Sequence, residues 1–337
     1  MKKIISFLNT DIKIINSYFL FTIVLIILVC VGYSSYALFS FTKTSTNVIE
    51  GTVGELKKSG VDTLIKLTNN QNNSGLYTIT HEADTTLQIG TNESVTEYRY
   101  RGANPKNYVT FNNEVWRIIG IFPTDDGTGK IENRIKIIRN ESIGNYQWNS
   151  SKKSNENWNN WSIATLNKYF NTTYFETVID KSKIATVKYY LGGYRTASIM
   201  KDVMYQYERK IKNTTSNEFY YGTNPNSWVG EIALMYASDY GYAASDECTN
   251  YMDHYHTCVS YNWLSYKVSD EWLLNQGSSS YVGGRAFYIY KQGYLEENNN
   301  NDVSSRLMAV RPTLYLKSNI KITGGDGTSS NPYTLGL

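Results

Sequence analysis

The chain has 337 residues, enough for one large domain or two small ones, and its 41% hydrophobic and 14% aromatic content can form a core. Its 33 lysines and arginines nearly balance its 30 acidic residues, which leaves a net charge of +3. This balance excludes the strongly basic surface with which proteins hold nucleic acid. Asparagine, lysine, isoleucine and tyrosine, all with AT-rich codons, are abundant and indicate a bacterial genome of low GC content.

Residues 18–41, YFLFTIVLIILVCVGYSSYALFSF, form an uncharged segment long enough to cross a hydrocarbon core of about 30 Å as a helix. Lys2, Lys3 and Lys13 precede this segment, and a single lysine follows it closely. The positive-inside rule therefore places residues 1–17 in the cytoplasm as a short stub and the rest of the chain outside the cell. The lipid bilayer is the predicted partner of this segment.

Two interpretations of the apolar segment stay open. A cleaved signal peptide would place the small residues Ser35 and Ala37 ahead of the cut, whereas an uncleaved signal anchor needs only the length already present. The long polar stretch before Tyr18 and the apolar residues after Ala37 favour the anchor. Cys30 lacks a preceding small residue of the kind expected before a lipidated cysteine, so we expect it to be an ordinary apolar residue.

Outside the membrane, composition divides the chain into a stalk and a domain. Residues 42–95 are rich in threonine, serine, asparagine and glycine, and we expect a stalk there, with a short helix within residues 51–67 and a break at NNQNNSG, residues 69–75. Residues 96–337 are expected to form one extracellular globular domain, because no segment within them has the composition of a linker.

Strand and turn patterns dominate this domain. YVTFNNEVWRIIGIF, residues 108–122, predicts a β-hairpin with Asn112 and Asn113 at its turn, and RIKIIR, residues 134–139, predicts the next antiparallel strand. Further predicted strands are EIALMYA (231–237), RAFYIYK (285–291) and AVRPTLYL (309–316).

Two helices complete the predicted fold. Ser162 is the expected cap of a helix over residues 161–170, and a second helix is expected over residues 196–211. The predicted apolar face of the second helix consists of Ile199, Val203, Tyr207 and Ile211. The predicted fold class is α+β, with a domain rich in antiparallel sheet and two main helices.

The stretch CTNYMDHYHTC, residues 248–258, holds two of the three cysteines and two of the three histidines. Thiols oxidise outside the cell, so a Cys248–Cys258 disulfide is expected, and the chain-entropy relation values such a ring at about 2.8 kcal/mol. The alternative is a zinc site, since His254, His256 and Cys258 would share one face of a strand. The spacing is not that of common structural zinc loops, and an oxidised cysteine does not bind zinc, so the disulfide is favoured.

No pattern for catalysis is complete. His81 lies in the predicted stalk and the other histidines in the cysteine-bounded stretch, which disfavours a serine or cysteine nucleophile activated by histidine. Asp239, Asp246 and Glu247, within SDYGYAASDE, are candidate ligand-binding or acid–base carboxylates, although a solvated turn also explains them. Phosphate-loop and EF-hand patterns are absent from the sequence, and no cofactor or metal is predicted.

An asparagine-rich segment, WNSSKKSNENWNNWS, holds three tryptophans. Trp148 and Trp161 are expected in the core, because tryptophan is highly buried on average. Trp158 is the expected exposed ring, where a flat aromatic surface beside amides can hold a sugar or a partner protein.

The series YRYRGANPKNYVTFNNEVWRIIGIF, RIKIIRNESIG, LNKYFNTTYF, WVGEIALMYASDYGYAAS, NWL, AVRPTLYL and GGDGTSSNPYTL resembles a family of uncharacterised bacterial exported domains that often follow a membrane segment. The resemblance implies a surface-exposed domain. More distantly, the order of elements is similar to the architecture of C-type lectins and formylglycine-generating enzymes. The calcium-binding tripeptides of the lectins, Glu-Pro-Asn, Gln-Pro-Asp and Trp-Asn-Asp, are absent, and so is the core pair of copper-binding cysteines of the enzymes, so neither activity is carried over.

Two classes of function follow from these observations. The first is a membrane-anchored bacterial cell-surface module that binds a glycan or a protein, and the second is an extracellular enzyme that uses carboxylates. A deep cleft lined by the three carboxylates would favour the enzyme, and a shallow aromatic surface would favour the binding module.

Overall fold

The computed structural model describes most of the chain after residue 57. The described residues are 58–89, 92–151, 159–194, 196–211, 224–266, 268–277, 284–297 and 303–337, together with 16, 20–23 and 25–28. The chain divides into two compact units, Met1–Lys57 and Lys58–Leu337, and each is described by itself. The second unit is called the head.

The described residues of the first unit are helical, and their side chains are exposed. Most of the predicted membrane segment, residues 18–41, lies outside the described residues. Among the described residues, no helix has the length and apolar character needed to span a membrane. The membrane anchor therefore stays a prediction.

A seven-stranded sheet forms the centre of the head, in the order β1-β2-β4-β5-β14-β9, with β3 paired to β4. Its strand pairs are antiparallel. The strands are β1 (Gly75–His81), β2 (Val95–Arg101), β3 (Tyr108–Phe111), β4 (Glu114–Asp125), β5 (Ile131–Arg139), β9 (Ile232–Ala233) and β14 (Thr313–Tyr315). Strands β4 and β5 are buried on both faces for much of their length, which is expected where both faces of a sheet are covered.

A second sheet has the order β12-β11-β10-β13-β6, and its β10–β13 pair is parallel. Its strands are β6 (Asn145–Tyr146), β10 (Glu271–Gln276), β11 (Ala286–Ile289), β12 (Leu295–Glu296) and β13 (Met308–Ala309). Two small sheets pair β7 (Val187–Tyr190) with β8 (Ser227–Gly230), and β15 (Lys321–Gly324) with β16 (Thr334–Gly336). The predicted α+β class with antiparallel sheets is confirmed.

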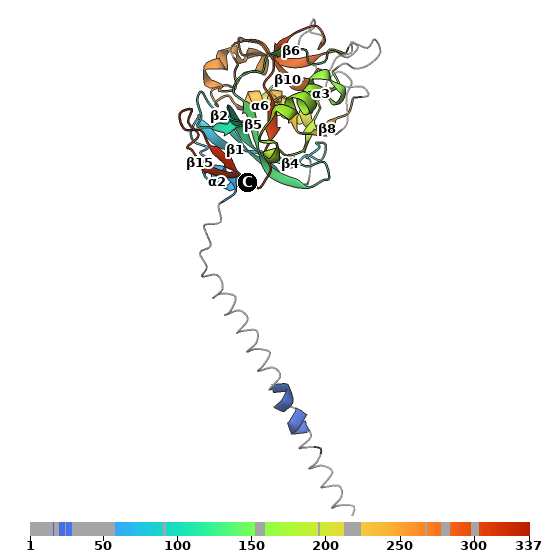
Figure 1. The fold of residues 1–337 in the computed structure, drawn as a ribbon, viewed down its shortest axis with the longest axis vertical. Helices are drawn as coiled ribbons and strands as arrows, with labels where there is room; N and C mark the ends of the chain where they lie inside the picture. The colour runs from blue at the N-terminus through green and yellow to red at the C-terminus, as the bar shows by residue number, and fades with distance from the viewer. Residues whose placement is uncertain are drawn as a thin grey trace, which may run out of the picture. The chain divides into compact units, whose positions relative to one another are not determined.

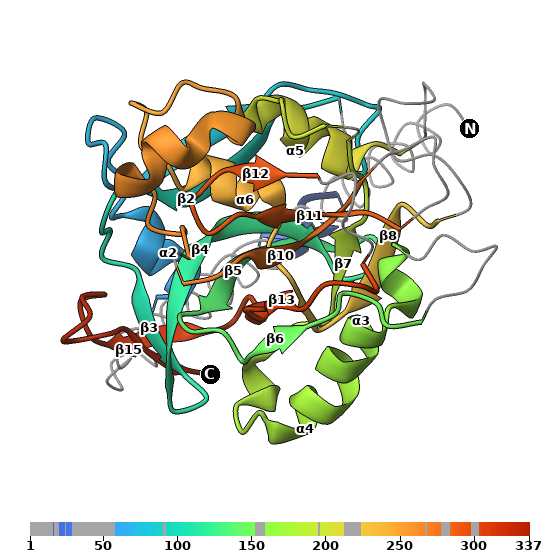
Figure 2. The same ribbon diagram turned by 90° about the horizontal axis from the view of Figure 1, so that it is seen from above.

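Short helices flank the two sheets. They are α2 (Gly60–Ile65), α3 (Thr165–Tyr169), α4 (Phe175–Thr177), α5 (Lys201–Arg209) and α6 (Ala237–Tyr242). A π-helical turn, Phe170–Tyr174, joins α3 to α4, and 3-10 segments cover Trp161–Ile163, Lys181–Lys183 and Met252–Tyr261. Figure 2 shows α5 and α4 at opposite edges of the head, α5 above β12 and α4 below β6.

The hairpin predicted from YVTFNNEVWRIIGIF is confirmed. Strand β3 pairs with β4 in the register Phe111↔Glu114, so Asn112 and Asn113 form a two-residue turn. Both asparagines have φ of 57°, which this turn type requires and which asparagine tolerates better than most residues.

The predicted face of the second helix is wrong. The side chains that α5 buries are Met204, Tyr205, Glu208 and Arg209. Of the predicted face, Ile199 is buried but precedes the helix, Val203 and Tyr207 are partly buried, and Ile211 is exposed. The charged pair Glu208 and Arg209 of α5 therefore faces the interior, and a search for apolar periodicity does not detect such a pair.

The first helix also begins differently from the prediction. Asn160 caps the 3-10 turn Trp161–Ile163, and its Oδ1 accepts hydrogen bonds from both the amide and the hydroxyl of Ser162. The α-helix α3 begins only at Thr165, after Ala164, which is extended and provides no side-chain cap. The helical segment then continues beyond residue 170 through the π-helical turn to Thr177.

The head includes part of the segment assigned to the stalk. It begins at Lys58 rather than at residue 96, because α2 packs against β5 and β15, and β1 is a strand of the main sheet. Figure 1 shows α2 beside β15. The Gly60 amide donates to the Ile320 carbonyl at 2.6 Å, and Leu64 is buried, so this end of the expected stalk is fixed to the head.

Candidate functional site

The three candidate carboxylates do not converge on one cleft. Asp239 is only 1% exposed and lies in the interior of the head. The Asp246 side chain is 59% exposed and pairs with Arg101. Glu247 is exposed and accepts a hydrogen bond from the side-chain amide of Asn73 at 3.2 Å. Glu247 lines the smaller of the two surface hollows described below, and Asp239 and Asp246 line neither.

Asp239 belongs to an internal ion-pair arrangement at the start of α6. Its Oδ2 is 2.5 Å from Lys136 Nζ and accepts the Tyr236 amide at 3.0 Å, and its Oδ1 accepts from Arg99 at 2.9 Å. Burial alone would raise the pKa of Asp239, but the charges of Lys136 and Arg99 lower it below its usual range. Asp239 is therefore a buried anion with its hydrogen-bonding capacity used within the protein.

The same arrangement extends to the buried face of α5. The side chains involved are Glu97, Arg99, Lys136, Glu208, Arg209 and Asp239, three acids and three bases, all buried. Glu97 contacts Arg99 at 2.8 Å and accepts from the Tyr205 hydroxyl at 3.0 Å, and Glu208 contacts Arg209 at 2.6 Å. Unpaired buried charge is costly, so this balance explains how the head tolerates six ionisable groups inside. Of these six residues, the sequence analysis singled out Asp239 alone.

The larger surface hollow, of about 490 Å³, lies between the loop after α2 and the loop after β2. Its lining residues are Leu67, Asn69, Asn72, Ser74, Gly75, Leu76, Tyr100, Asn104, Pro105, Lys106, Asp326 and Tyr333. Of its apolar lining residues, Leu76, Tyr100, Pro105 and Tyr333 are buried and Leu67 is half exposed, while the asparagine, lysine and aspartate residues are exposed. The hollow thus combines an apolar floor with a polar rim.

A smaller hollow, of about 340 Å³, adjoins the first, because Asn72 and Ser74 line both. Its other lining residues are Asn73, Ala103, Ser245, Glu247 and Tyr261. The Tyr261 side chain is 44% exposed, and Ser245 Oγ is buried with no hydrogen-bond partner among the described residues. A buried hydroxyl without a partner is unfavourable, so a ligand group that hydrogen-bonds Ser245 would stabilise the site.

The wall shared by the two hollows is the loop NNQNNSG, and Arg101 fastens it to the head. The Arg101 guanidinium donates to the Asn70 carbonyl at 3.2 Å and to the Asn72 carbonyl at 3.0 Å, and it lies 4.0 Å from the centre of the Tyr77 ring. The Thr78 amide also donates to Asn70 Oδ1 at 2.8 Å. The predicted break is therefore an ordered loop that presents its asparagines to the surface.

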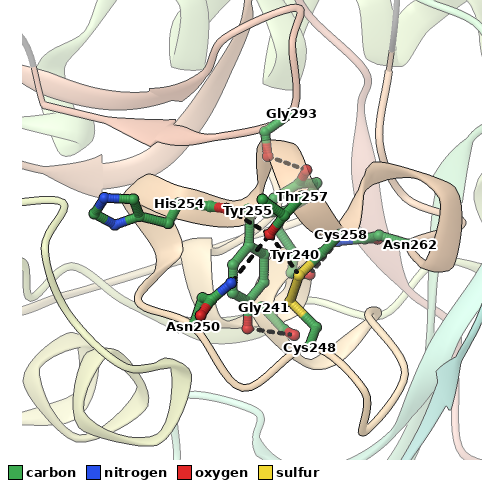
Figure 3. Close-up of a disulfide and its surroundings, with 10 residues drawn as sticks. All are labelled: Tyr240, Gly241, Cys248, Asn250, His254, Tyr255, Thr257, Cys258, Asn262 and Gly293. Atoms are coloured by element: carbon green, nitrogen blue, oxygen red, sulfur yellow. Dashed lines mark hydrogen bonds between the residues drawn. A yellow bond between two sulfur atoms is a disulfide. The ribbon is translucent and has the colours of Figure 1, made fainter.

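The expected disulfide is present between Cys248 and Cys258, with their Cα atoms 5.6 Å apart. Cys248 directly follows Glu247, and the 3-10 segment that contains Cys258 ends at Tyr261, so the bond fixes the backbone beside the smaller hollow. Figure 3 shows the disulfide beside the ring of Tyr255, which is buried.

The three residues of the zinc alternative do not lie on one face of a strand, as that alternative requires. His254, His256 and Cys258 lie on a 3-10 segment rather than a strand, and the Cys258 sulfur is bonded to Cys248. Figure 3 shows His254 pointing away from the disulfide. Within the part of the chain that the structure describes, no three histidine, cysteine or acidic side chains are grouped so as to hold a metal ion.

Trp148 and Trp161 are buried in the core as expected, with their ring centres 5.2 Å apart. The Trp148 indole donates to the Leu273 carbonyl at 2.9 Å, which ties the segment to β10. Trp158 lies outside the described residues, so its role as an exposed ring stays a prediction.

No family model, curated protein or solved structure matches the chain. The resemblances noted in the sequence therefore stay predictions.

Proposed function

We propose that the head is an extracellular glycan-binding module, held at a bacterial cell membrane by residues 18–41, and that the two adjoining hollows are its binding site. The observation that carries this proposal is the composition of the smaller hollow. It combines the half-exposed ring of Tyr261, the carboxylate of Glu247 and the unpartnered hydroxyl of Ser245. A C-type-lectin-like arrangement of the head is compatible with this function and is proposed with it.

The chemistry of both hollows suits a sugar. A pyranose ring has apolar C–H faces that stack on aromatic rings, and hydroxyl groups that both donate and accept hydrogen bonds. Asn72, Asn73 and Asn104 offer amides that donate and accept, and Tyr261 offers the stacking surface. The charges on the rim of the larger hollow, Lys106 and Asp326, are opposite in sign.

The site is also ordered before a ligand arrives. The Arg101 contacts hold one wall, and the Cys248–Cys258 disulfide holds the backbone beside the other. Preorganisation reduces the entropy that binding must overcome, which matters for weakly bound ligands such as sugars. A disulfide is itself typical of proteins outside the cytoplasm, and this supports the proposed location.

The alternative, a carboxylate-dependent enzyme, receives less support from the geometry. Glycoside hydrolysis, for example, uses two carboxyl groups that flank the scissile bond. Glu247 lines a hollow, but Asp246 pairs with Arg101 and Asp239 is buried with Lys136. The three carboxylates therefore do not supply such a pair at one site.

A glycan array tests the proposal directly. The detergent-purified full chain is expected to bind a subset of glycans, and Tyr261→Ala and Glu247→Gln are expected to lose that signal. Tyr251→Ala is the matched control, because Tyr251 is a 52% exposed tyrosine that lines neither hollow. Equal signals from the wild type and Tyr261→Ala, or no signal from the wild type, contradict the assignment. Trp158→Ala on the same array tests the separate prediction that Trp158 contacts the sugar.

A further inference from the structure

The contact between Lys136 on β5 and Asp239 on α6 is fully shielded from solvent, whereas the lysines that pair with Asp125, Asp180 and Glu176 are partly exposed. Lys136 Nζ lies 2.5 Å from Asp239 Oδ2, with the two residues 0% and 1% exposed. We propose that this pair condenses after folding into an intramolecular amide bond that covalently links β5 to α6. The proposal is independent of what the hollows bind.

The surroundings of the pair exclude water and favour a neutral product. Lys136 Nζ is 4.3 Å from the centre of the Tyr236 ring, 5.3 Å from that of Tyr315 and 6.0 Å from that of Phe122. Two charges in such a shielded site carry a desolvation penalty, and an amide does not. Burial also lowers the pKa of Lys136, although Asp239 opposes the shift, and a neutral amine is the form that acts as a nucleophile.

The groups in contact with Asp239 supply what the condensation needs. A proton first passes from Nζ to Oδ2, which converts the ion pair into a neutral amine and a neutral acid. The Nζ lone pair then forms a bond to Cγ, and negative charge collects on Oδ1, where Arg99 Nη1 donates at 2.9 Å. A second proton moves from Nζ to Oδ2, the Cγ–Oδ2 bond breaks, and one water molecule leaves. No oxidant or other reactant is required.

The buried charges of the head still cancel after the condensation. Condensation removes one positive and one negative charge, which leaves Glu97 and Glu208 opposite Arg99 and Arg209. Arg99 keeps its contact with Glu97 at 2.8 Å after the Asp239 carboxylate becomes an amide. The cross-link therefore leaves no buried charge without a partner. It would fix α6, the helix that leads into the Ser245 and Glu247 side of the smaller hollow, to the middle of the main sheet.

Peptide mapping of the wild-type full chain, reduced and digested with trypsin, tests the proposal. Trypsin does not cleave after an acylated lysine, so we expect a branched product that joins residues 135–139 to residues 213–267 and is lighter than its two parts by one water. Lys188, which contacts Asp125 at a partly exposed position, is the internal control and is expected to be cleaved normally. A free peptide ending at Lys136, with no branched product, overturns the proposal.

A variant provides the second measurement. Lys136→Met removes the nucleophile, so its intact mass should match its sequence, whereas the wild type should be lighter than its sequence by one water after reduction. If the wild type and Lys136→Met both show their full sequence masses, the pair is an ion pair only.

Discussion

Removal of the Cys248–Cys258 disulfide is expected to loosen one side of the smaller hollow without unfolding the head. The perturbation is the double variant Cys248→Ala/Cys258→Ala, which removes the bond but leaves buried side chains at both positions. The bond joins residues separated by 10 positions, and the chain-entropy relation then gives a loss of about 2.8 kcal/mol. That value corresponds to roughly a hundredfold change in an opening equilibrium.

Other contacts of the segment explain why the loss should be local. Met252 and Tyr255 are buried, and the Met252 amide donates to the Ile199 carbonyl at 3.0 Å. The Ser245 amide donates to the Tyr261 carbonyl at 3.0 Å, outside the ring that the disulfide closes. Apolar burial throughout the head supplies most of its stability, so the fold should persist.

Hydrogen exchange read by mass spectrometry is the assay. Amides of residues 248–261 should exchange faster in the double variant, by up to about a hundredfold where exchange reports on opening of this segment. Amides of β4 and β5 should keep their protection. The reasoning is refuted if exchange in residues 248–261 is unchanged, or if the protection of β4 and β5 is lost together with it.

The wild-type protein also allows a direct test for the Cys248–Cys258 disulfide. In the wild type, mass spectrometry of the alkylated, non-reduced head should show the two cysteine peptides joined and two hydrogens lighter. Two alkylated thiols with one equivalent of bound zinc would instead favour the site of His254, His256 and Cys258.

Three further predictions concern titration, packing and topology. Burial raises the pKa of Glu297 to about 7, so the stability that its protonated form contributes is complete below pH of about 4.3 and is lost as the pH rises through 7. Glu297→Gln removes this titration. The free energy of unfolding of the variant minus that of the wild type, measured with denaturant, should therefore be up to about 3 kcal/mol higher at pH 8 than at pH 4. An equal difference at the two pH values contradicts this. Gly120→Ala should lower the melting temperature strongly, because its Cβ would lie 2.2 Å from the Tyr98 carbonyl oxygen; an unchanged melting temperature contradicts the close strand contact. Protease added to intact cells should remove the head, and a head protected until lysis would mean that the orientation is reversed.

The elements that the sequence predicts best are those fixed by local chemistry. The β3–β4 hairpin follows from two asparagines that tolerate positive φ between β-forming residues. The disulfide follows from two nearby cysteines in a chain that is predicted to be exported. Both depend on neighbours in the sequence, so the fold adds little information to them.

The elements that the sequence predicts poorly depend on distant partners. Strand β1 lies in a polar segment assigned to the stalk, and its place in the sheet depends on pairing with β2. Glu208 and Arg209 are typical surface residues on a helix, and only tertiary contacts reveal that they pair inside. In the site, Glu247 was identified from its sequence, whereas Tyr261 and Ser245 carry no local signal and enter the hollow through the fold.

Calorimetric titration of the best array ligand measures directly whether a glycan binds at the smaller hollow. Tyr261→Ala should weaken binding at least about tenfold, equivalent to about 1.4 kcal/mol, because the stacking surface is lost. Tyr251→Ala should leave the affinity unchanged, since Tyr251 lines neither hollow. Equal affinities for the wild type and Tyr261→Ala would mean that the glycan does not bind at the smaller hollow.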